Sequence, residues 1–365
     1  MTEKLQELLR QFNIGSDTWE LIDAYELFDG HINKTYVLET MQGGVLRRYV
    51  LQEINTFVFK RPVEVMENIV RVTAFLRERI AAGEAPGQKT MKVNPASDGK
   101  DYYIDKNGGY WRCYDFVENS YSLQAADESS AEQAGRAFGM FQRLLNSFPI
   151  DQLHETIPDF HHTQRRYEAF EAAIEKNTAS RRDEAVAEIA FVRARKDDCA
   201  KLVDLLMAGE LPLRVTHNDT KLNNVLFDKD TDEAACVIDF DTIMPGLSLY
   251  DYGDALRFLG NAAAEDERDL SKVQFVMPLF RAYTRGYLEA AKAALIPAEI
   301  RMLPFAIKLM TLECGMRFLT DYLNGDVYFR IHCPDHNLVR CRTQFKLVEE
   351  IEKLLDEMDT YIASL

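Results

Sequence analysis

Four polar residues in the middle of the chain have types and spacings that could do chemistry together: His217, Asp219, Asn224 and Asp239. Two apolar, strand-like runs flank the polar turn at 228–233, which is typical of a β-hairpin. A hairpin would bring the four residues to its open end. There a carboxylate can accept a proton from a hydroxyl, and amide and carboxylate oxygens can bind Mg²⁺.

The spacing His-x-Asp-x4-Asn is that of a kinase catalytic loop. Asp219 would orient an acceptor hydroxyl and take its proton as the bond to phosphorus forms. Asn224 and Asp239 would bind Mg²⁺ beside the nucleotide phosphates, and Asp241 is a candidate second metal ligand. His217 is expected to hold the loop by hydrogen bonds. The alternative is a structural hairpin, because a lone Asp in such a turn is more often a cap than a base.

Composition limits the class of protein and its partners. The chain has 365 residues, 47% hydrophobic and 28% charged, which is typical of a globular protein large enough for two lobes. Its formal charge of −16 argues against a nucleic acid or an anionic membrane as partner. No apolar stretch approaches the ~18 residues of a membrane span, and the N-terminus lacks signal-peptide features. Six scattered cysteines indicate reduced thiols, so we expect a cytoplasmic protein of open oligomeric state, compatible with a monomer.

The first third of the chain predicts a small α+β lobe. Short turns at Asp29-Gly30 and Gly43-Gly44 separate the first three strand-like runs, which indicates an antiparallel meander. Pro62 opens a helix that Gly83 closes. The expected strands are 21–28, 34–40, 45–54, 89–93, 102–104 and 109–117.

The turn between the first two of these strands is a candidate phosphate-binding loop. Gly30 allows the backbone to approach a ligand, and backbone amides in such a turn can face phosphates. We therefore predict nucleotide contacts from Gly30, Asn33 and Thr35. One glycine is weak evidence, so a plain hairpin turn is the alternative; the catalytic loop favours the phosphate interpretation.

Helical patterns dominate after residue 118. Ser129 to Glu132 resembles a capping box in front of a helix, and 159–176 and 183–207 also have helical spacing. We expect a hinge at 118–127, an N-terminal lobe over 1–118 with one main helix, and a larger, mostly helical C-terminal lobe over 119–365.

These residues resemble the aminoglycoside phosphotransferase/choline kinase family, and within it most closely the N-acetylhexosamine 1-kinases. The catalytic loop at 217–224 is specific for the large family. The segments 30–35 and 317–323 are more specific for the sugar 1-kinase branch. The segments that carry the resemblance are 30–36, 111–118, 217–224, 237–242, 244–246, 250–254 and 315–323.

The resemblance implies a bilobal, protein-kinase-like fold that uses ATP and Mg²⁺. The acceptor would be the anomeric hydroxyl of N-acetylglucosamine or N-acetylgalactosamine, with Asp219 as the base, giving the sugar 1-phosphate. The epimer preferred, the need for the N-acetyl group and the nucleotide preference stay open. Adenine would be held by backbone around Tyr114, Asp115, Phe116 and Val117, and the sugar by His31, Asp219, Thr242, Arg317 and Asp321.

One position departs from the kinase pattern. Kinases carry a lysine on the third strand that binds the α- and β-phosphates. Here Gln52 stands about there, and Arg48 shares its face of the strand because facing alternates. Arg48 is therefore a candidate phosphate ligand. The sugar 1-kinase branch also tends to lack this lysine, so the departure does not by itself indicate a dead enzyme.

Two alternatives follow from the same residues. One is a kinase of another small alcohol, such as an aminoglycoside, choline or homoserine; acidic groups at Asp251, Asp254 and Asp321 could serve a cationic acceptor. The other is a pseudokinase that binds nucleotide or sugar without transfer, which only the missing lysine supports. Arg317 also has a plainer interpretation, an ion pair with Asp321 one helical turn away.

Overall fold

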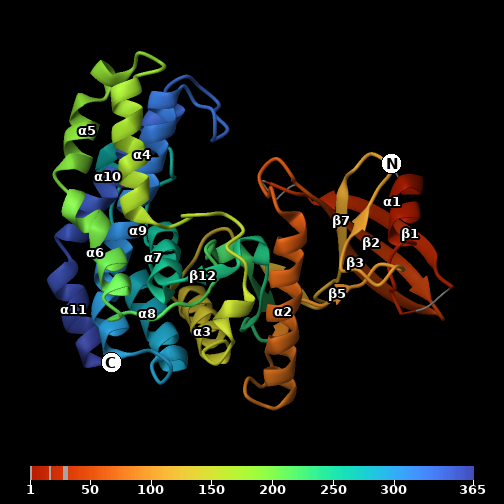
Figure 1. Ribbon diagram of the computed structural model, residues 1–365. Coiled ribbons are helices and arrows are strands. Elements are labelled where there is room, and N and C mark those ends of the chain that lie inside the picture. Colours follow the sequence, from red (N-terminus) through yellow and green to blue (C-terminus); the bar gives the residue numbers. More distant parts are fainter. Residues whose placement is uncertain (1, 16–17, 28–31) are drawn as a thin grey trace. The chain divides into compact units, whose positions relative to one another are not determined.

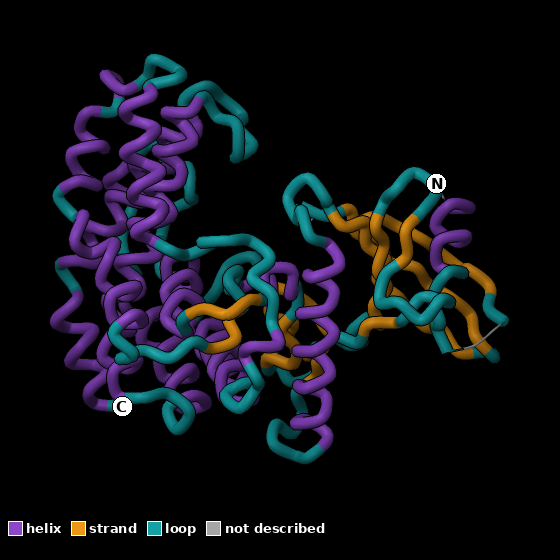
Figure 2. The backbone as a smooth tube through the Cα atoms, viewed as in Figure 1, coloured by secondary structure: helices purple, strands orange, loops and turns teal. Residues whose placement is uncertain are grey.

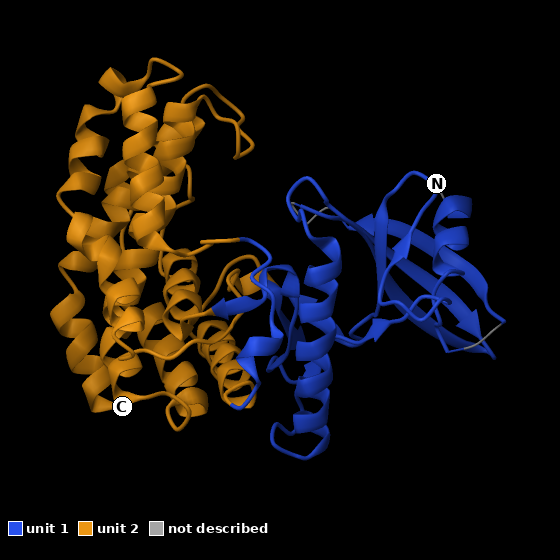
Figure 3. Ribbon diagram, in the orientation of Figure 1, with its two compact units in different colours: residues 1–122, 147–157, 224–245 blue, residues 123–146, 158–223, 246–365 orange. Residues whose placement is uncertain are grey.

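The computed structural model describes residues 2–15, 18–27 and 32–365. It confirms an α+β fold with an N-terminal antiparallel sheet and a mostly helical C-terminal part (Figures 1 and 2). The chain divides into two compact units (Figure 3). Unit 1 comprises Met1–Ser122, Ser147–Ile157 and Asn224–Pro245, and unit 2 comprises Leu123–Asn146, Pro158–Asn223 and Gly246–Leu365.

Unit 1 is built on a six-stranded sheet in which, over the described residues, all pairings are antiparallel. The strand order is β1-β2-β3-β7-β5, with β6 also paired to β7. One face of this sheet packs on helix α1 through Tyr49, Leu51 and Cys113, all buried. Side chains alternate along a strand, so Gln52 and Arg112 lie on the opposite face. The elements are α1 (Thr2–Leu9), β1 (Glu20–Leu27), β2 (Lys34–Gln42), β3 (Val45–Ile54), α2 (Pro62–Ala81), β5 (Val93–Asn94), β6 (Tyr103–Ile104) and β7 (Tyr110–Asp115).

The second sheet of unit 1 carries the hairpin on which the sequence places the candidate catalytic residues. Its strand order is β4 (Lys89–Thr90), β11 (Ala234–Val237), β10 (Val225–Asp228) and β8 (Ser120–Ser122). The single strand expected over 89–93 is therefore wrong: Lys89–Thr90 pairs in parallel with β11, and Val93–Asn94 joins the first sheet. The hairpin thus pairs with β4 on one side and with β8 on the other.

Unit 2 is a helical body. Helices α3 and α8 cross so closely that a Cβ atom on Gly135 would lie 2.1 Å from the carbonyl oxygen of Tyr283. Only glycine permits this approach. The elements are α3 (Glu128–Leu144), α4 (Thr163–Lys176), α5 (Val186–Arg193), α6 (Lys196–Met207), β9 (Arg214–Thr216), α7 (Ser248–Leu259), α8 (Met277–Ala291), α9 (Pro297–Asn324), α10 (His336–Glu352) and α11 (Leu355–Ser364).

Two sequence-based expectations in unit 2 need correction. The capping box of α3 is formed by Asp127 and Ser130, whose side chains each accept a hydrogen bond from the other's backbone amide, rather than by Ser129 and Glu132. The helix expected over 183–207 is two helices, α5 and α6, with a break at 194–195. Both errors concern element ends, where apolar spacing gives the weakest signal.

Candidate active site

The open end of the hairpin in unit 1 brings Asn224 and Asp239 to neighbouring positions. Asn224 ends a short 3₁₀ turn, η3 (Leu222–Asn224), and its carbonyl accepts a hydrogen bond of 2.9 Å from the amide of Ile238. Asn224 is buried, whereas Asp239 is exposed. The apolar run at 236–240 predicts a return strand that includes Asp239, but β11 ends at Val237, so Asp239 lies two residues past the strand. It has a left-handed backbone (φ 65°), a conformation that costs free energy in a residue other than glycine.

Asp241 lies two residues further on, in the 3₁₀ turn η4 (Phe240–Thr242), and is buried. Asn33 donates to its Oδ2 and Arg112 donates to its Oδ1. Asn33 also accepts, through Oδ1, a hydrogen bond of 2.9 Å from the amide of Asn55. Thr242, the last residue of η4, is half-buried. Asp241 is thus a junction between the hairpin and the six-stranded sheet.

The donor set at this end of the hairpin fits a nucleotide-bound Mg²⁺. Such ions are usually held by one or two carboxylates, with phosphate oxygens and waters completing the shell. The exposed carboxylate of Asp239 and the amide side chain of Asn224 meet this requirement. No group of three or more His, Cys, Asp and Glu residues able to hold a metal occurs in the described residues, so no metal centre built wholly from such side chains is indicated there. Asp241 differs from Asp239 because a guanidinium already neutralises it.

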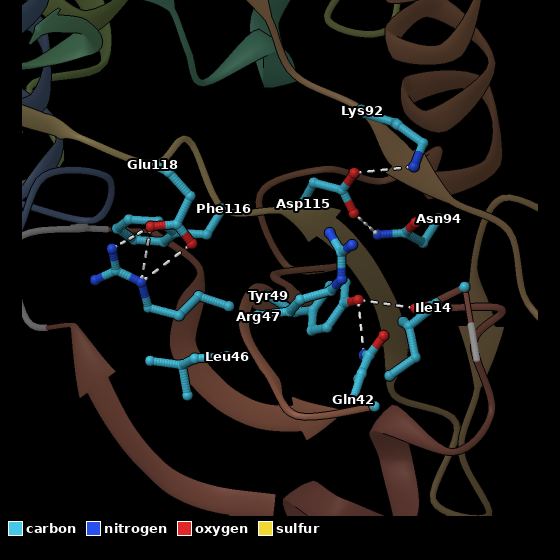
Figure 4. Close-up of a pocket in the computed structure, with 13 residues that line it drawn as sticks. Ile14, Gln42, Leu46, Arg47, Tyr49, Lys92, Asn94, Asp115, Phe116 and Glu118 are labelled. Atoms are coloured by element: carbon cyan, nitrogen blue, oxygen red, sulfur yellow. Dashed lines mark hydrogen bonds and ion pairs between the residues drawn. The ribbon is translucent and has the colours of Figure 1, made fainter. Parts of the chain in front are cut away.

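Strand β7 ends in the segment expected to hold adenine. Tyr114 is buried, and burial raises the pKa of its phenol. The side chain of Asp115 points toward Lys92 (2.9 Å) and Asn94 (2.8 Å), as Figure 4 shows. The amide of Asp115 donates to the carbonyl of Lys92, and that of Phe116 to the carbonyl of Arg48. Among the described residues these amides are therefore used, and the amide of Val117 is the first one past them.

Arg48 lies at the same end of the sheet. Its Nε donates to Glu118 Oε2 at 3.1 Å, and its guanidinium lies 4.3 Å from the centre of the Phe116 ring. The hydrogen bond to Glu118 raises the pKa of Arg48. Glu118, Phe116, Asp115 and Tyr49 are among the residues that line a pocket of about 560 Å³ (Figure 4). The guanidinium expected to bind phosphate is thus paired at the end of the strand.

The predicted phosphate loop is partly described. Gly30 and His31 lie outside the described residues. Thr35, on β2, accepts a hydrogen bond of 2.9 Å from the side chain of Gln52. Asn33 donates to Asp241. The two described members of the loop, Asn33 and Thr35, therefore contact side chains of the same cluster, which Gln52, Arg112 and Asp241 form on the face of the sheet opposite α1.

Unit 2 holds the first half of the predicted catalytic loop through one carboxylate. Asp251, fully buried on α7, accepts a hydrogen bond of 2.9 Å from the backbone amide of His217 through Oδ2. Through Oδ1 it accepts one of 2.8 Å from the backbone amide of Asn218. Gln142 donates to Oδ2 at 3.1 Å. Asn218 has a left-handed backbone (φ 62°), which this clamp stabilises. Asp254 adds an amide contact to Thr220.

Asp219, in this loop, has the exposure that a base needs. Its side chain is 28% exposed, and its Oδ1 lies 2.8 Å from the Nζ of Lys221. Burial lowers the pKa of Lys221, but the charge and hydrogen bond of Asp219 outweigh it, so that pKa is raised. The ring of His217 is buried against the edges of Phe138 and Phe141. These contacts suit a supporting role for His217.

A second cluster in unit 2 surrounds Arg317 on α9. Its guanidinium lies 5.5 Å from the ring centre of Phe160 and 5.6 Å from that of Phe329. One turn earlier, Glu313 is buried and bonded to His161 Nδ1 at 2.8 Å. Burial raises the pKa of Glu313, but His161 and Arg317 outweigh it, so that pKa is lowered and the group is a carboxylate at neutral pH.

Arg166 on α4 completes this cluster. Its Nε and Nη2 both donate to the carbonyl of Phe160. Burial and then the charge of Arg317 lower its pKa, so the two guanidiniums are close enough to interact. Within the described residues neither arginine forms an ion pair with a carboxylate. The sequence singled out Arg317 but not its neighbours in this cluster. Arg166 and His161 are far from Arg317 in sequence, and Glu313, four residues before it, is one of many charged residues at helical spacing.

Asp321, the other predicted sugar contact on α9, faces a loop. It accepts hydrogen bonds of 2.9 Å each from the amides of Val327, Tyr328 and Phe329. Asn337 donates to it at the same distance. These four bonds occupy its carboxylate, and in the described chain it forms no ion pair with Arg317.

Residues 25–294 match the phosphotransferase enzyme family. The chain belongs to this family. Solved structures agree in fold along the whole length. A microcompartment-associated aminopropanol kinase is 17% identical, with 98% of this chain and 99% of that one covered and a TM-score of 0.60. An aminoglycoside phosphotransferase from Alicyclobacillus acidocaldarius is 14% identical over 99% and 96%, with a TM-score of 0.61.

A third similar structure was solved with bound ligands. A spectinomycin phosphotransferase solved with ADP and spectinomycin is 14% identical, with 100% of this chain and 98% of that one covered and a TM-score of 0.53. At these identities the likeness shows the fold.

Among the described residues, no helix has both the length and the apolar character required to cross a membrane.

Proposed function

We propose that this phosphotransferase moves the γ-phosphoryl group of ATP to the anomeric hydroxyl of an N-acetylhexosamine, giving the sugar 1-phosphate and ADP. Three features support a transfer enzyme rather than a binding protein. Asp219, Asn224 and Asp239 are all present, Asp219 is reachable by solvent, and the loop that carries it is clamped by a buried carboxylate. A clamped, partly exposed base is what proton transfer requires.

The residues divide the reaction between them. Asp219 accepts the proton of the acceptor hydroxyl. At the same time the hydroxyl oxygen bonds to the γ-phosphorus, and the bond from that phosphorus to the β,γ-bridging oxygen breaks. Lys221, 2.8 Å away, holds Asp219 in place. Asn224 and Asp239 would hold Mg²⁺, which neutralises phosphate charge when bound. The backbone past β7, and first the amide of Val117, would hold adenine.

The observation that carries the choice of acceptor is the charge balance in unit 2. A cationic acceptor needs carboxylates that are not already paired. Asp251 and Asp321 accept hydrogen bonds from backbone amides, and Asp254 forms an ion pair with Arg257 at 2.8 Å. The Arg317 cluster, with two guanidiniums and one carboxylate, is net positive. A positive cluster disfavours choline, ethanolamine or an aminoglycoside and favours a neutral acceptor with several oxygens.

A sugar suits this cluster in a second way. The planar fork of a guanidinium can bridge neighbouring hydroxyl or carbonyl oxygens, and the flanking rings of Phe160 and Phe329 provide apolar surface beside Arg317. We include Arg317 and Asp219 in the sugar site, with Thr242 and His31 as further expected contacts. We assign Asp321 to holding the loop at 327–329.

ADP release with a panel of acceptors tests the proposal. The panel contains N-acetylglucosamine, N-acetylgalactosamine, glucose, galactose, choline, ethanolamine, aminopropanol and an aminoglycoside. We expect turnover with at least one N-acetylhexosamine, abolished in the Asp219→Asn variant. Turnover restricted to the cationic alcohols would refute the acceptor assignment and leave the kinase assignment standing.

A further inference from the structure

The third strand of the sheet lacks a cation where phosphate binding calls for one. Kinases carry a lysine there for the α- and β-phosphates, and β3 of this chain has Gln52. The neighbouring strand supplies a positive charge at the same place. Arg112 of β7 stands directly across from Gln52 in the antiparallel pairing. Directly opposed residues project from the same face of a sheet.

The contacts of Arg112 agree with this register. Its Nε donates to the side-chain oxygen of Gln52 at 3.0 Å, and its Nη1 donates to Asp241. Gln52 in turn donates to Thr35 of the predicted phosphate loop. A chain of hydrogen bonds therefore runs from that loop through Gln52 and Arg112 to the turn that carries Asp239 and Asp241.

The charge of Arg112 is held in a buried position. The residue is 1% exposed, and burial alone would lower its pKa. Asp241, Tyr114 and Asp239 outweigh that effect, so the pKa of Arg112 is raised and the guanidinium stays charged. A buried charge is stable only when it is compensated. Asp241 compensates it here, while Asp239, the expected metal ligand, also acts on it.

One end of the Arg112 guanidinium has no hydrogen-bond partner among the described residues. Among the described residues, Nε contacts Gln52 and Nη1 contacts Asp241, with the sulfur of Met66 at 4.0 Å, whereas Nη2 makes no hydrogen bond. An arginine has five N–H donors, and charged donors of this kind suit phosphate oxygens. The free end of Arg112 is thus available in unit 1, in the same cluster as the expected metal ligands.

Arg48 is a weaker candidate for this task. It precedes Gln52 by four residues, which along a strand is roughly 13 Å. Its guanidinium is bonded to Glu118 and stacked on Phe116 at the end of the sheet. It would have to break both contacts to reach a phosphate beside Asp239.

We propose that Arg112 supplies, from β7, the phosphate-binding cation that kinases carry on the third strand. In the bound state its Nη2 donates to a non-bridging phosphate oxygen of the nucleotide, while Gln52 and Asp241 orient it. Asp241 is then the anchor of this arginine and not a second metal ligand. This inference rests on the nucleotide use in the proposed function.

The test measures nucleotide binding without an acceptor, so that it does not depend on the acceptor's identity. ADP and adenosine are titrated into the wild type and into Arg112→Met, Arg112→Lys, Arg48→Met and the double variant Gln52→Lys/Arg112→Met. We expect Arg112→Met to weaken ADP binding by about 10- to 100-fold and to leave adenosine binding within about threefold, because only ADP carries phosphates. Arg48→Met should change ADP affinity by less than about threefold.

The double variant moves the cation back to the third strand. It should bind ADP at least about tenfold more tightly than Arg112→Met, and it also compensates Asp241 if the single variant does not fold. A merely structural role for Arg112 would weaken ADP and adenosine equally and would not be rescued by the swap. Wild-type ADP affinity in a folded Arg112→Met, or a folded swap variant that binds ADP no better than adenosine, would overturn the inference. Failure of the wild type to bind ADP would instead overturn the proposed function, and this inference with it.

Discussion

Asp251→Asn should disable the enzyme without touching a reacting group. Asp251 accepts three hydrogen bonds, two from the loop amides of His217 and Asn218 and one from Gln142. An amide replaces one of its oxygens with a donor. At least one bond to a charged acceptor is then lost and one buried amide is left without a partner, which costs roughly 2 to 4 kcal/mol.

Part of this cost is offset. Burial raises the pKa of Asp251, so removing the charge also removes a desolvation penalty. We therefore expect a net loss in the free energy of unfolding of about 2 kcal/mol, within the roughly 5–15 kcal/mol typical of a domain. The protein stays folded, but the loop shifts. A displacement of about 1 Å at Asp219 is enough for a loss of about 100-fold in kcat.

Urea unfolding and ADP release with the best acceptor measure the two effects. Asp183→Asn is the matched control, because that side chain is 86% exposed, and it should change neither quantity. Wild-type kcat in Asp251→Asn, with wild-type unfolding, would show that the loop does not depend on this carboxylate. It would remove the physical basis for calling His217 and Asn218 a clamped loop.

Three further predictions follow. Asp219→Asn should lower kcat by several orders of magnitude at unchanged unfolding free energy; near-wild-type turnover would exclude Asp219 as the proton acceptor. Arg317→Ala should raise the sugar KM by about tenfold and the ATP KM by less than about twofold, and the reverse split would place Arg317 on the nucleotide. Glu313→Gln tests a pH effect. Because the folded pKa of Glu313 is lowered, its stabilisation is complete above the unfolded pKa of 4.5 and is lost as pH falls through the folded pKa. The stability gap between wild type and this variant should close in acid; a constant gap in urea titrations from about pH 7 to about pH 3 would contradict it.

The sequence was sufficient for the fold class and for most elements of the sheet. Alternating apolar residues and glycine turns located β1, β2, β3 and β7, and Pro62 located the start of α2, because these signals are local. Strand partners were not readable in this way. Lys89–Thr90 pairs with Cys236 and Val237, far along the chain, and unit 1 takes up segments 147–157 and 224–245 long after its first sheet ends.

In the candidate site, too, local spacing was readable from the sequence and tertiary contacts were not. Asp219, Asn224 and Asp239 could be predicted as candidates because kinase chemistry fixes their spacing. Arg112 was part of a predicted strand, but its pairing with Gln52 depends on register and its bond to Asp241 joins residues 129 positions apart. Arg166 on α4 and His161, just before it, likewise meet Glu313 and Arg317 through packing on α9, which apolar spacing alone does not predict.

The identity of the phosphorylated product tests the central claim most directly. The enzyme is incubated with ATP, Mg²⁺ and N-acetylglucosamine or N-acetylgalactosamine, and the product is analysed by phosphorus NMR. We predict a phosphate on the anomeric oxygen, seen by its coupling to the anomeric proton, together with one equivalent of ADP. Phosphate on another hydroxyl, or no product from either sugar while choline or an aminoglycoside is phosphorylated, would contradict the proposed sugar 1-kinase activity.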